Sequence, residues 1–366
     1  MKRLFVGLFA GLLALSVIAQ DDEFRVSVVV DGLGPTVMYY LTDAGGTVND
    51  YGIKTVKDGR LDFSHSMNDV GYLVIMFNPS TSVFVPAVPG EYAVLGGNID
   101  NCSIDGSPIY KAYGEAMAGL RPLIDASQHF DFKKDYKQEI EGKSSEEVYD
   151  LYQAKWRALS RAVSDAALAY IKQHHDQEVS MMLMNQLGDI SDLEQVEAIV
   201  DAEVLDGRMY PYFVERNVQV DETGFSNPLI NKLAPDFTLY DVNGTPLSLS
   251  SLHGKWVLLN FWGATCGNAV SQFPDLKELY TKYKDQIEIL GVGEDDEDEW
   301  KNAVISTYAL PWKNVNGYST NESDTPSSLY NVTGYPTYFL ITPSGKVVMM
   351  SHSVQDAKYI FELLFD

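Results

Sequence analysis

The sequence has few cysteines and few positive charges. Only two of the 366 residues are cysteines, Cys102 and Cys266. Two cysteines exclude a disulfide-rich scaffold and any zinc site built from several cysteines. Lysine and arginine total 27 against 51 aspartates and glutamates, which gives a formal net charge of -24 at pH 7. Because so acidic a surface repels phosphate backbones and anionic headgroups, we expect no binding to nucleic acid or to a membrane surface.

Long hydrophobic runs are also scarce, and none reaches the roughly 20 residues that a helix needs to cross a bilayer. An apolar run over residues 4–19 follows Lys2 and Arg3 and ends in the small residue Ala19. This pattern predicts an export signal over residues 1–19, with an uncleaved membrane anchor as the alternative. After removal of the signal we expect no stable membrane insertion and a location in the periplasm or cell envelope, where thiols can oxidise.

The remaining chain divides into three segments with different residue patterns. Residues 24–105 contain short runs of apolar residues separated by glycine, proline and asparagine turns, which predicts an antiparallel β sandwich. In residues 107–217 apolar residues recur at helical spacing, most regularly from 145 to 174, which predicts a helical connector. Residues 232–366 alternate strand-like and helix-like stretches, which predicts an α/β domain. We therefore expect a multidomain chain of these three parts.

The C-terminal segment carries short motifs among its predicted elements. We expect a buried strand over residues 256–262, a helix over 270–284, a strand over 287–292 and a helix over 298–308. The motifs, in chain order, are Ala234-Pro235-Asp236-Phe237, Cys266-Gly267, Phe273-Pro274 and Gly334-Tyr335-Pro336-Thr337.

In this order and spacing, the motifs resemble the thioredoxin superfamily, and within it the exported thiol-disulfide oxidoreductases of the TlpA/ResA type. The resemblance implies a thioredoxin-like fold for residues 232–366. It also implies that Cys266 is the nucleophile and that Tyr335 and Pro336, joined by a cis bond, form a wall for client docking. Residues 56–63 are similar, more weakly, to a small β domain found ahead of such domains in envelope proteins.

Cys266 lies between a predicted strand and a predicted helix. The start of a helix carries a partial positive charge and free N–H groups, which favour a thiolate. Thiol-disulfide exchange begins with that thiolate. We expect Trp262, at the end of the strand, to pack beside the loop that carries the cysteine.

The residues around Cys266 depart from the pattern of the family. Ala269 stands where the second cysteine of the motif is expected, so a mixed disulfide cannot be released within the motif. Gln272 stands where TlpA/ResA-type proteins commonly have a glutamate, and a glutamine cannot act as an acid or a base. Thr265 and Asn268 replace the usual tryptophan and proline.

Two functions remain open. The first is a single-cysteine (CxxA) protein of thiol-disulfide homeostasis, which forms mixed disulfides through Cys266 with a thiol- or disulfide-bearing client protein or a low-molecular-weight thiol. The residues that would support this site or bind the client are Trp262, Thr265, Gly267, Asn268, Ala269, Gln272, Tyr335 and Pro336. The alternative is a redox-inactive binding or chaperone-like module of the cell envelope, in which Cys266 is a residual thiol.

We expect no cofactor and no metal ion. The acidic run at residues 294–299 lacks the alternating ligands and the central glycine of a calcium loop, and a solvated helix start explains it better. His174 and His175 are adjacent on a predicted helix and therefore point apart. The methionines within residues 181–184 are expected in the core.

Overall fold

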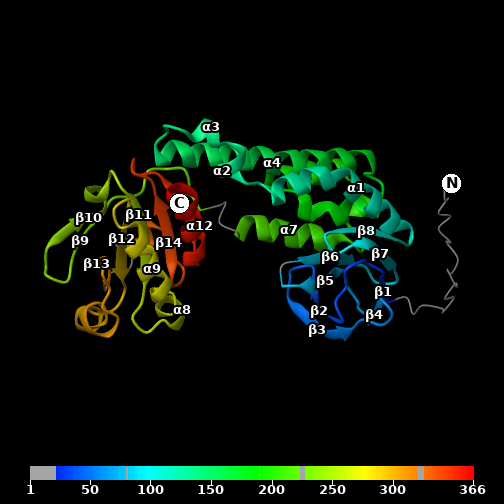
Figure 1. Cartoon of the computed structure of the whole chain (residues 1–366), viewed down its shortest axis with the longest axis horizontal. Helices are drawn as coiled ribbons and strands as arrows, with labels where there is room; N and C mark the ends of the chain where they lie inside the picture. The colour runs from blue at the N-terminus through cyan, green and yellow to red at the C-terminus, as the bar shows by residue number, and fades with distance from the viewer. Residues whose placement is uncertain (1–21, 80, 189, 223–226, 320–324) are drawn as a thin grey trace, which may run out of the picture. The chain divides into compact units, whose positions relative to one another are not determined.

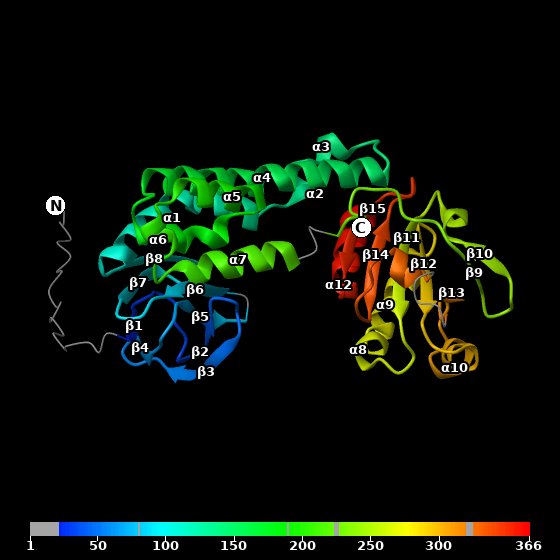
Figure 2. The same cartoon turned by 180° about the vertical axis from the view of Figure 1, so that it is seen from behind.

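Figure 1 and Figure 2 show the protein from opposite sides as a computed structural model. The structure describes residues 22–79, 81–188, 190–222, 227–319 and 325–366. The predicted export signal over residues 1–19 lies outside these ranges. Within them, no helix has both the length and the apolar character needed to cross a membrane.

The chain forms two compact units. The first consists of Met1–Pro122 and Val163–Asn217, and the second of Leu123–Ala162 and Val218–Asp366. The unit boundaries fall inside three helices, α1 (Pro108–Gln128), α4 (Ser145–Gln173) and α7 (Tyr210–Glu222), so each helix contributes residues to both units. The predicted long helix over residues 145–174 is confirmed as α4.

The first unit contains two four-stranded sheets. Their strands are β1 (Glu23–Val28), β2 (Thr36–Asp43), β3 (Val48–Thr55), β4 (Leu61–Ser66), β5 (Gly71–Asn78), β6 (Thr81–Ala87), β7 (Tyr92–Asn98) and β8 (Asn101–Gly106). The strand orders are β4-β1-β7-β8 and β3-β2-β5-β6. Neighbouring strands pair antiparallel except β1 and β7, which are parallel, so the expectation of a purely antiparallel region is wrong for this pair. Parallel strands need a long connection, and the chain from β2 to β6 supplies it.

Helices complete the first unit. They are η1 (Glu178–Gln186), α5 (Ile190–Ile199) and α6 (Ala202–Leu205), with parts of α1, α4 and α7. Tyr212 on α7 is buried, donates its hydroxyl to the Gly71 carbonyl of β5 at 2.6 Å, and packs its ring 5.0 Å from Tyr72. Helix α7 is thereby fixed to the second sheet of this unit. Met181, Met182 and Met184 are buried in η1, as predicted.

The second unit is built on a five-stranded sheet with the order β13-β12-β11-β14-β15. Its strands are β11 (Trp256–Trp262), β12 (Ile287–Gly293), β13 (Lys313–Asn316), β14 (Thr337–Ile341) and β15 (Val347–Ser351), and a separate hairpin joins β9 (Thr238–Tyr240) to β10 (Pro246–Ser248). Its helices are α2 (Phe132–Asp135), α3 (Lys137–Ile140), η2 (Leu249–Leu252), α8 (Gly267–Val270), α9 (Phe273–Tyr283), α10 (Glu297–Asn302), η3 (Ala303–Thr307), α11 (Pro326–Leu329) and α12 (Val354–Phe365). The predicted strands at 256–262 and 287–292 are confirmed as β11 and β12.

Both faces of the five-stranded sheet are buried. Along β11, Trp256 and Leu258 belong to one core, with residues of α9 and α12, whereas Val257 and Leu259 belong to the other. Figure 2 shows α9 and α12 beside the sheet. Because side chains alternate across a strand, a strand with a core on each face reads as the continuous apolar run seen in the sequence.

Two predicted helices are corrected. The helix expected over residues 270–284 is divided into α8 and α9, with a break at Ser271 and Gln272. Pro274 lacks a backbone N–H and is therefore suited to the first turn of a new helix rather than to a helix interior. The helix expected over residues 298–308 is α10 followed by the π-helical turn η3.

The first turns of α4 pack against the sheet of the second unit. The Trp256 indole N–H donates to Ser145 Oγ at 2.8 Å, and the Tyr149 ring lies edge-on to Trp256 at 5.5 Å. The Tyr149 hydroxyl donates to the Val348 carbonyl of β15 at 3.2 Å. This part of α4 therefore belongs to the core of the second unit, although the sequence places it in the helical segment.

Candidate active site around Cys266

Cys266 is delivered by the central strand β11. The strand ends at Trp262, which is fully buried and packs edge-on against Phe273 of α9, with 5.2 Å between the ring centroids. A short loop then leads to Cys266, which occupies the N-cap position of α8. The backbone N–H groups of Ala269 and Val270 both donate to the Cys266 carbonyl at 3.0 Å. The side chain of Cys266 is half-buried.

The loop before β14 brings Tyr335 and Pro336 to Cys266. Strand β14 runs antiparallel to β11, with Thr337 opposite Phe261, so the start of β14 meets the end of β11. The peptide bond between Tyr335 and Pro336 is cis. The Cys266 thiol lies 3.4 Å from the Tyr335 carbonyl oxygen. Two segments that are distant in the sequence thus meet at the sulfur.

The other predicted site residues lie at different depths around the cysteine. Thr265, Gly267 and Asn268 are exposed. Ala269 is fully buried in the core that also contains Trp262 and Phe273. The position expected for a second cysteine is therefore filled by a buried methyl group.

Gln272 connects α8 and α9 to the segment between β15 and α12. Its side-chain oxygen Oε1 accepts from the Val354 backbone N–H at 2.7 Å. Its Nε2 donates to the His352 carbonyl at 3.1 Å and to the Asn268 carbonyl at 3.4 Å. His352 in turn has its Nδ1 2.8 Å from the Pro336 carbonyl oxygen. The amide of Gln272 therefore acts as both donor and acceptor in a hydrogen-bonded frame that ends at Pro336.

Two carboxylates that the sequence analysis assigned to solvent lie at this site. Asp296 and the residues after it do form the start of α10, and the Asp296 side chain accepts from the N–H groups of Asp298 and Glu299. Glu294 and Asp295, in contrast, are half-buried. Glu294 and Asp295 were therefore misassigned.

Each of these two carboxylates accepts a hydrogen bond from a residue near the Cys266 site. The Glu294 carboxylate accepts from the Ser327 hydroxyl, and the Asp295 carboxylate accepts from the Ala264 backbone N–H at 2.7 Å. Burial is the main cause that raises the pKa of each carboxyl above its usual range. Burial also raises the pKa of Tyr335, and the negative charge of Glu294 adds to this effect.

The sequence did contain a signal for these two residues. Glu294 and Asp295 directly follow β12, and Cys266 follows β11 after a short loop. The strands are parallel neighbours, so their carboxyl ends meet at one edge of the sheet, where functional groups of α/β folds commonly gather.

Cys102 lies on β8 of the first unit and is also a free thiol. Its sulfur is 3.3 Å from the Asn98 carbonyl oxygen, and burial raises the pKa of the Cys102 thiol. His175 pairs with Asp201 at 2.8 Å. Across the residues that the structure describes, no cluster of three or more His, Cys, Asp or Glu side chains could hold a metal ion.

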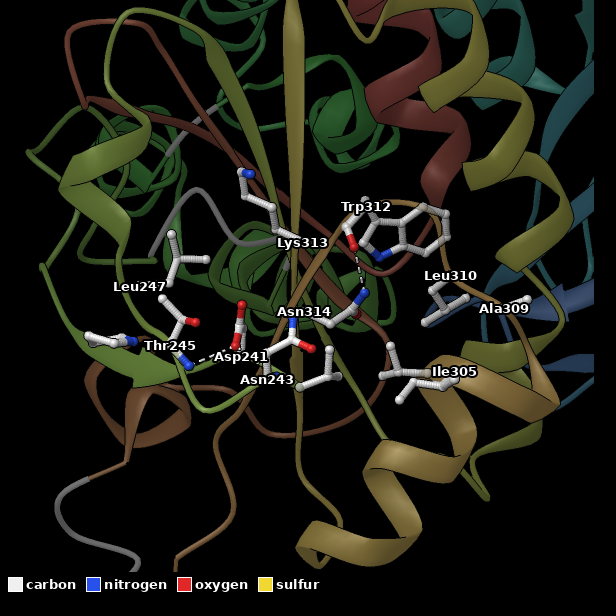
Figure 3. A pocket seen from close by; sticks show the side chains of 13 residues that line it. Asp241, Asn243, Thr245, Leu247, Ile305, Ala309, Leu310, Trp312, Lys313 and Asn314 are labelled. Atoms are coloured by element: carbon white, nitrogen blue, oxygen red, sulfur yellow. Dashed lines mark hydrogen bonds between the residues drawn. The ribbon is translucent and has the colours of Figure 1, made fainter.

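A cavity of about 650 Å³ lies elsewhere in the second unit, between the β9–β10 hairpin, η3 and the edge strand β13 (Figure 3). Ile305, Leu310 and Trp312 line one side, and Asp241 and Thr245 of the hairpin line another. None of the site residues predicted from the sequence lines this cavity.

The C-terminal part of the chain is similar to known thiol-disulfide oxidoreductases. Residues 230–350 match the AhpC/TSA family. The thiol-disulfide oxidoreductase ResA of Bacillus thuringiensis subsp. konkukian is 32% identical over 136 residues, which cover 37% of this chain and 76% of that protein. ResA of Bacillus subtilis is 36% identical over 116 residues, covering 31% of this chain and 63% of that protein. The crystal structure of the thioredoxin domain of a thiol-disulfide oxidoreductase from Bacteroides vulgatus is 28% identical, covers 37% of this chain and 97% of that chain, and has a TM-score of 0.34.

The five-stranded sheet, the Cys266 loop and the ResA matches define the C-terminal part of the chain, which includes residues 230–350, as a thioredoxin-like domain of thiol-disulfide oxidoreductases. The chain belongs to the ResA family of thiol-disulfide oxidoreductases.

Proposed function

We propose that this protein acts in thiol-disulfide homeostasis as a single-cysteine thioredoxin-like protein that forms mixed disulfides through Cys266. The observation that carries the proposal is the position of the thiol, which is half-buried at the start of α8 and 3.4 Å from the Tyr335 carbonyl oxygen. A thiol between a helix start and a neighbouring chain segment can react with a disulfide that lies across that segment.

The reaction proceeds by exchange at sulfur. The Cys266 thiolate forms a bond to one sulfur of a client disulfide, the client S–S bond breaks, and its second sulfur leaves as a thiolate that takes a proton from water. Ala269 cannot perform the second attack, because it has no sulfur. Release of the client then requires a thiol from outside the motif, supplied by the client or by a low-molecular-weight thiol.

The client-binding surface follows from the same arrangement. Tyr335 and Pro336 form one side of the site, and the exposed residues Thr265, Gly267 and Asn268 form the other. We assign a supporting role to Trp262 and Gln272. Trp262 packs against Phe273 of α9, and Gln272 links α8 and α9 to His352 and Val354.

A redox-inactive binding module is the second candidate function. The buried methyl group of Ala269 and the structural hydrogen bonds of Gln272 favour it, because both positions serve packing here rather than proton or sulfur transfer. The two candidates differ in one measurable property, which is the reactivity of Cys266.

We further propose that the protein is exported, and that the two four-stranded sheets of the first unit pack as a β sandwich. The basic and apolar pattern of residues 1–19 supports export. Tyr39 of β2 and Phe63 of β4 come from different sheets and lie edge-on with 5.0 Å between their ring centroids, which supports face-to-face packing of the sheets over residues 24–105.

Reaction with glutathione disulfide tests the proposed function. In a Cys102→Ser background, intact-mass spectrometry is expected to show one glutathionyl adduct, formed at Cys266 and removed by added thiol. The matched Cys266→Ser variant, with Cys102 present, is expected to form adduct far more slowly, because burial raises the pKa of the Cys102 thiol. Absence of an adduct on Cys266 in the folded protein favours the binding module.

A further inference from the structure

Asp295 and Cys266 both lie close to Gly263. A Cβ atom placed on Gly263 would be 3.7 Å from Asp295 Oδ1, 3.7 Å from Tyr335 Cδ2 and 3.9 Å from Cys266 Cβ. The Asp295 carboxylate also accepts from the Ala264 N–H at 2.7 Å, in the loop between β11 and the cysteine. A charged side chain after β12 is therefore hydrogen bonded to the segment that positions the thiol.

The contacts around Asp295 are made by several elements. Asn316 at the end of β13 donates to the Asp295 carbonyl at 3.2 Å. The Tyr308 hydroxyl donates to the Ala264 carbonyl at 2.9 Å, on the other side of the same loop residue. Ala264 is thus held through its N–H by Asp295 and through its carbonyl by Tyr308, which limits movement of the loop.

The electrostatic surroundings of this carboxylate are acidic. The negative charge of Asp296 adds to the rise in the pKa of Asp295. The charges of Glu294, Asp295 and Cys266 likewise add to the rise in the pKa of the neighbouring Tyr335. Burial raises the pKa of Asp295, and the hydrogen bond from the Ala264 N–H acts in the opposite direction by favouring the ionised carboxylate. A half-buried carboxylate that is hydrogen bonded to the loop of a reactive cysteine is a candidate for a functional role.

We propose that Asp295 is a positioning residue of the Cys266 site, which holds the cysteine loop through Ala264 and gives the site a preference for positively charged disulfides. The inference rests on the proposed function, because it requires attack of Cys266 on a disulfide. The disulfide is the oxidant: one of its sulfurs bonds to Cys266 as the S–S bond breaks, and the other leaves as a thiolate. A negative carboxylate beside the thiol attracts cationic reactants and repels anionic ones.

Two small disulfides of opposite charge test the preference. Cystamine is cationic and 3,3′-dithiodipropionate is anionic at pH 7, and adduct formation on Cys266 is followed by mass spectrometry in a Cys102→Ser background. We expect cystamine to react about 5- to 20-fold faster than the anion at low salt, relative to their rates with a free model thiol. The ratio is expected to fall in about 0.5 M salt, because salt screens the attraction that a charged reactant feels as it approaches from solvent.

Variants at Asp295 separate its charge from its hydrogen bond. Asp295→Asn keeps an oxygen acceptor for the Ala264 N–H and removes the charge, so the charge preference is expected to fall several-fold. Asp298→Asn removes one charge from an exposed position in the same acidic run and is expected to keep the preference within about twofold. Asp295→Ala removes the acceptor as well, and hydrogen exchange at the Ala264 N–H is expected to accelerate in this variant and not in Asp295→Asn.

The outcomes distinguish this inference from the proposed function. Equal rates for the two disulfides, faster reaction of the anion, or an unchanged ratio in Asp295→Asn would overturn the role of Asp295 while leaving mixed-disulfide formation intact. Equal exchange at Ala264 in Asp295→Ala and the parent protein would overturn the positioning role. No adduct with either disulfide would overturn the inference together with the proposed function.

Discussion

The Cys266 sulfur lies 3.4 Å from the carbonyl oxygen of Tyr335. This contact joins the loop after β11 to the loop before β14, and it depends on the antiparallel register that places Phe261 opposite Thr337. Any chain segment that pairs with the loop at Tyr335 would therefore lie next to the thiol.

Restoring the second cysteine should restore dithiol chemistry. Ala269→Cys is expected to raise insulin disulfide reduction at least tenfold over the parent protein, because Cys266 then has a resolving partner at the spacing of the motif. Ala269→Ser, which is similar in size and has no thiol, is the matched control and is expected to show no gain. A folded Ala269→Cys protein without increased reduction would contradict the assignment of position 269.

Replacing Gln272 by glutamate should weaken the second unit. A glutamate can still accept from the Val354 N–H, but when ionised it cannot donate to the His352 carbonyl. We expect Gln272→Glu to lower the free energy of unfolding by about 1 kcal/mol at pH 7, measured by urea denaturation. Gln272→Met, which loses all three side-chain hydrogen bonds without adding charge, provides the comparison. A more stable glutamate variant would argue against the structural role of the amide.

The half-buried Glu294 carboxylate should make stability depend on pH. Because burial raises its pKa in the folded state, the folded state binds a proton more tightly than the unfolded state, and stability is lost as pH rises through the folded value. Glu294→Gln keeps an acceptor for the Ser327 hydroxyl and removes the charge. The variant is expected to raise Tm by roughly 1–2 °C at pH 7, with the gain shrinking toward pH 4. A gain that is equal at both pH values would contradict this explanation.

The contact between α4 and the sheet should contribute strongly to stability. Tyr149 is buried, packs on Trp256 and donates to the Val348 carbonyl. Tyr149→Ala is expected to cost about 3–4 kcal/mol in urea unfolding of the full chain, as for other large aromatic truncations in cores. Trp156→Ala, at an exposed position of the same helix, is expected to cost far less. Similar losses in both variants would show that Tyr149 is not part of a core.

The sequence predicted the elements whose signals are local. The apolar run of β11, the helical spacing of α4 and the motifs at Cys266 and Pro336 each lie within a few residues, and the structure contains each of them. The break between α8 and α9 was missed, although Pro274 marked it, because the apolar spacing continues across the break.

The remaining features depend on partners that are distant in the chain. From the sequence alone, Gln272 is interpreted as the replacement of a functional glutamate. Its structural role becomes visible only from its hydrogen bonds to His352 and Val354. From the sequence alone, Asp295 is predicted to be one of several solvated acidic residues. The pairing of β11 with β12 is what brings it next to Ala264. Composition alone cannot show which carboxylates of an acidic run turn inward, because that choice is made by strand register.

The reactivity of Cys266 relative to Cys102 is the most direct test of a nucleophilic role for Cys266. Iodoacetamide labelling of the folded chain at pH 7, with each site followed by peptide mass spectrometry, compares two thiols of one molecule under identical conditions. We predict that Cys266 is labelled at least tenfold faster than Cys102, because Cys266 sits at a helix start whereas burial raises the pKa of the Cys102 thiol. Equal labelling, or slower labelling of Cys266, would contradict a nucleophilic role for Cys266.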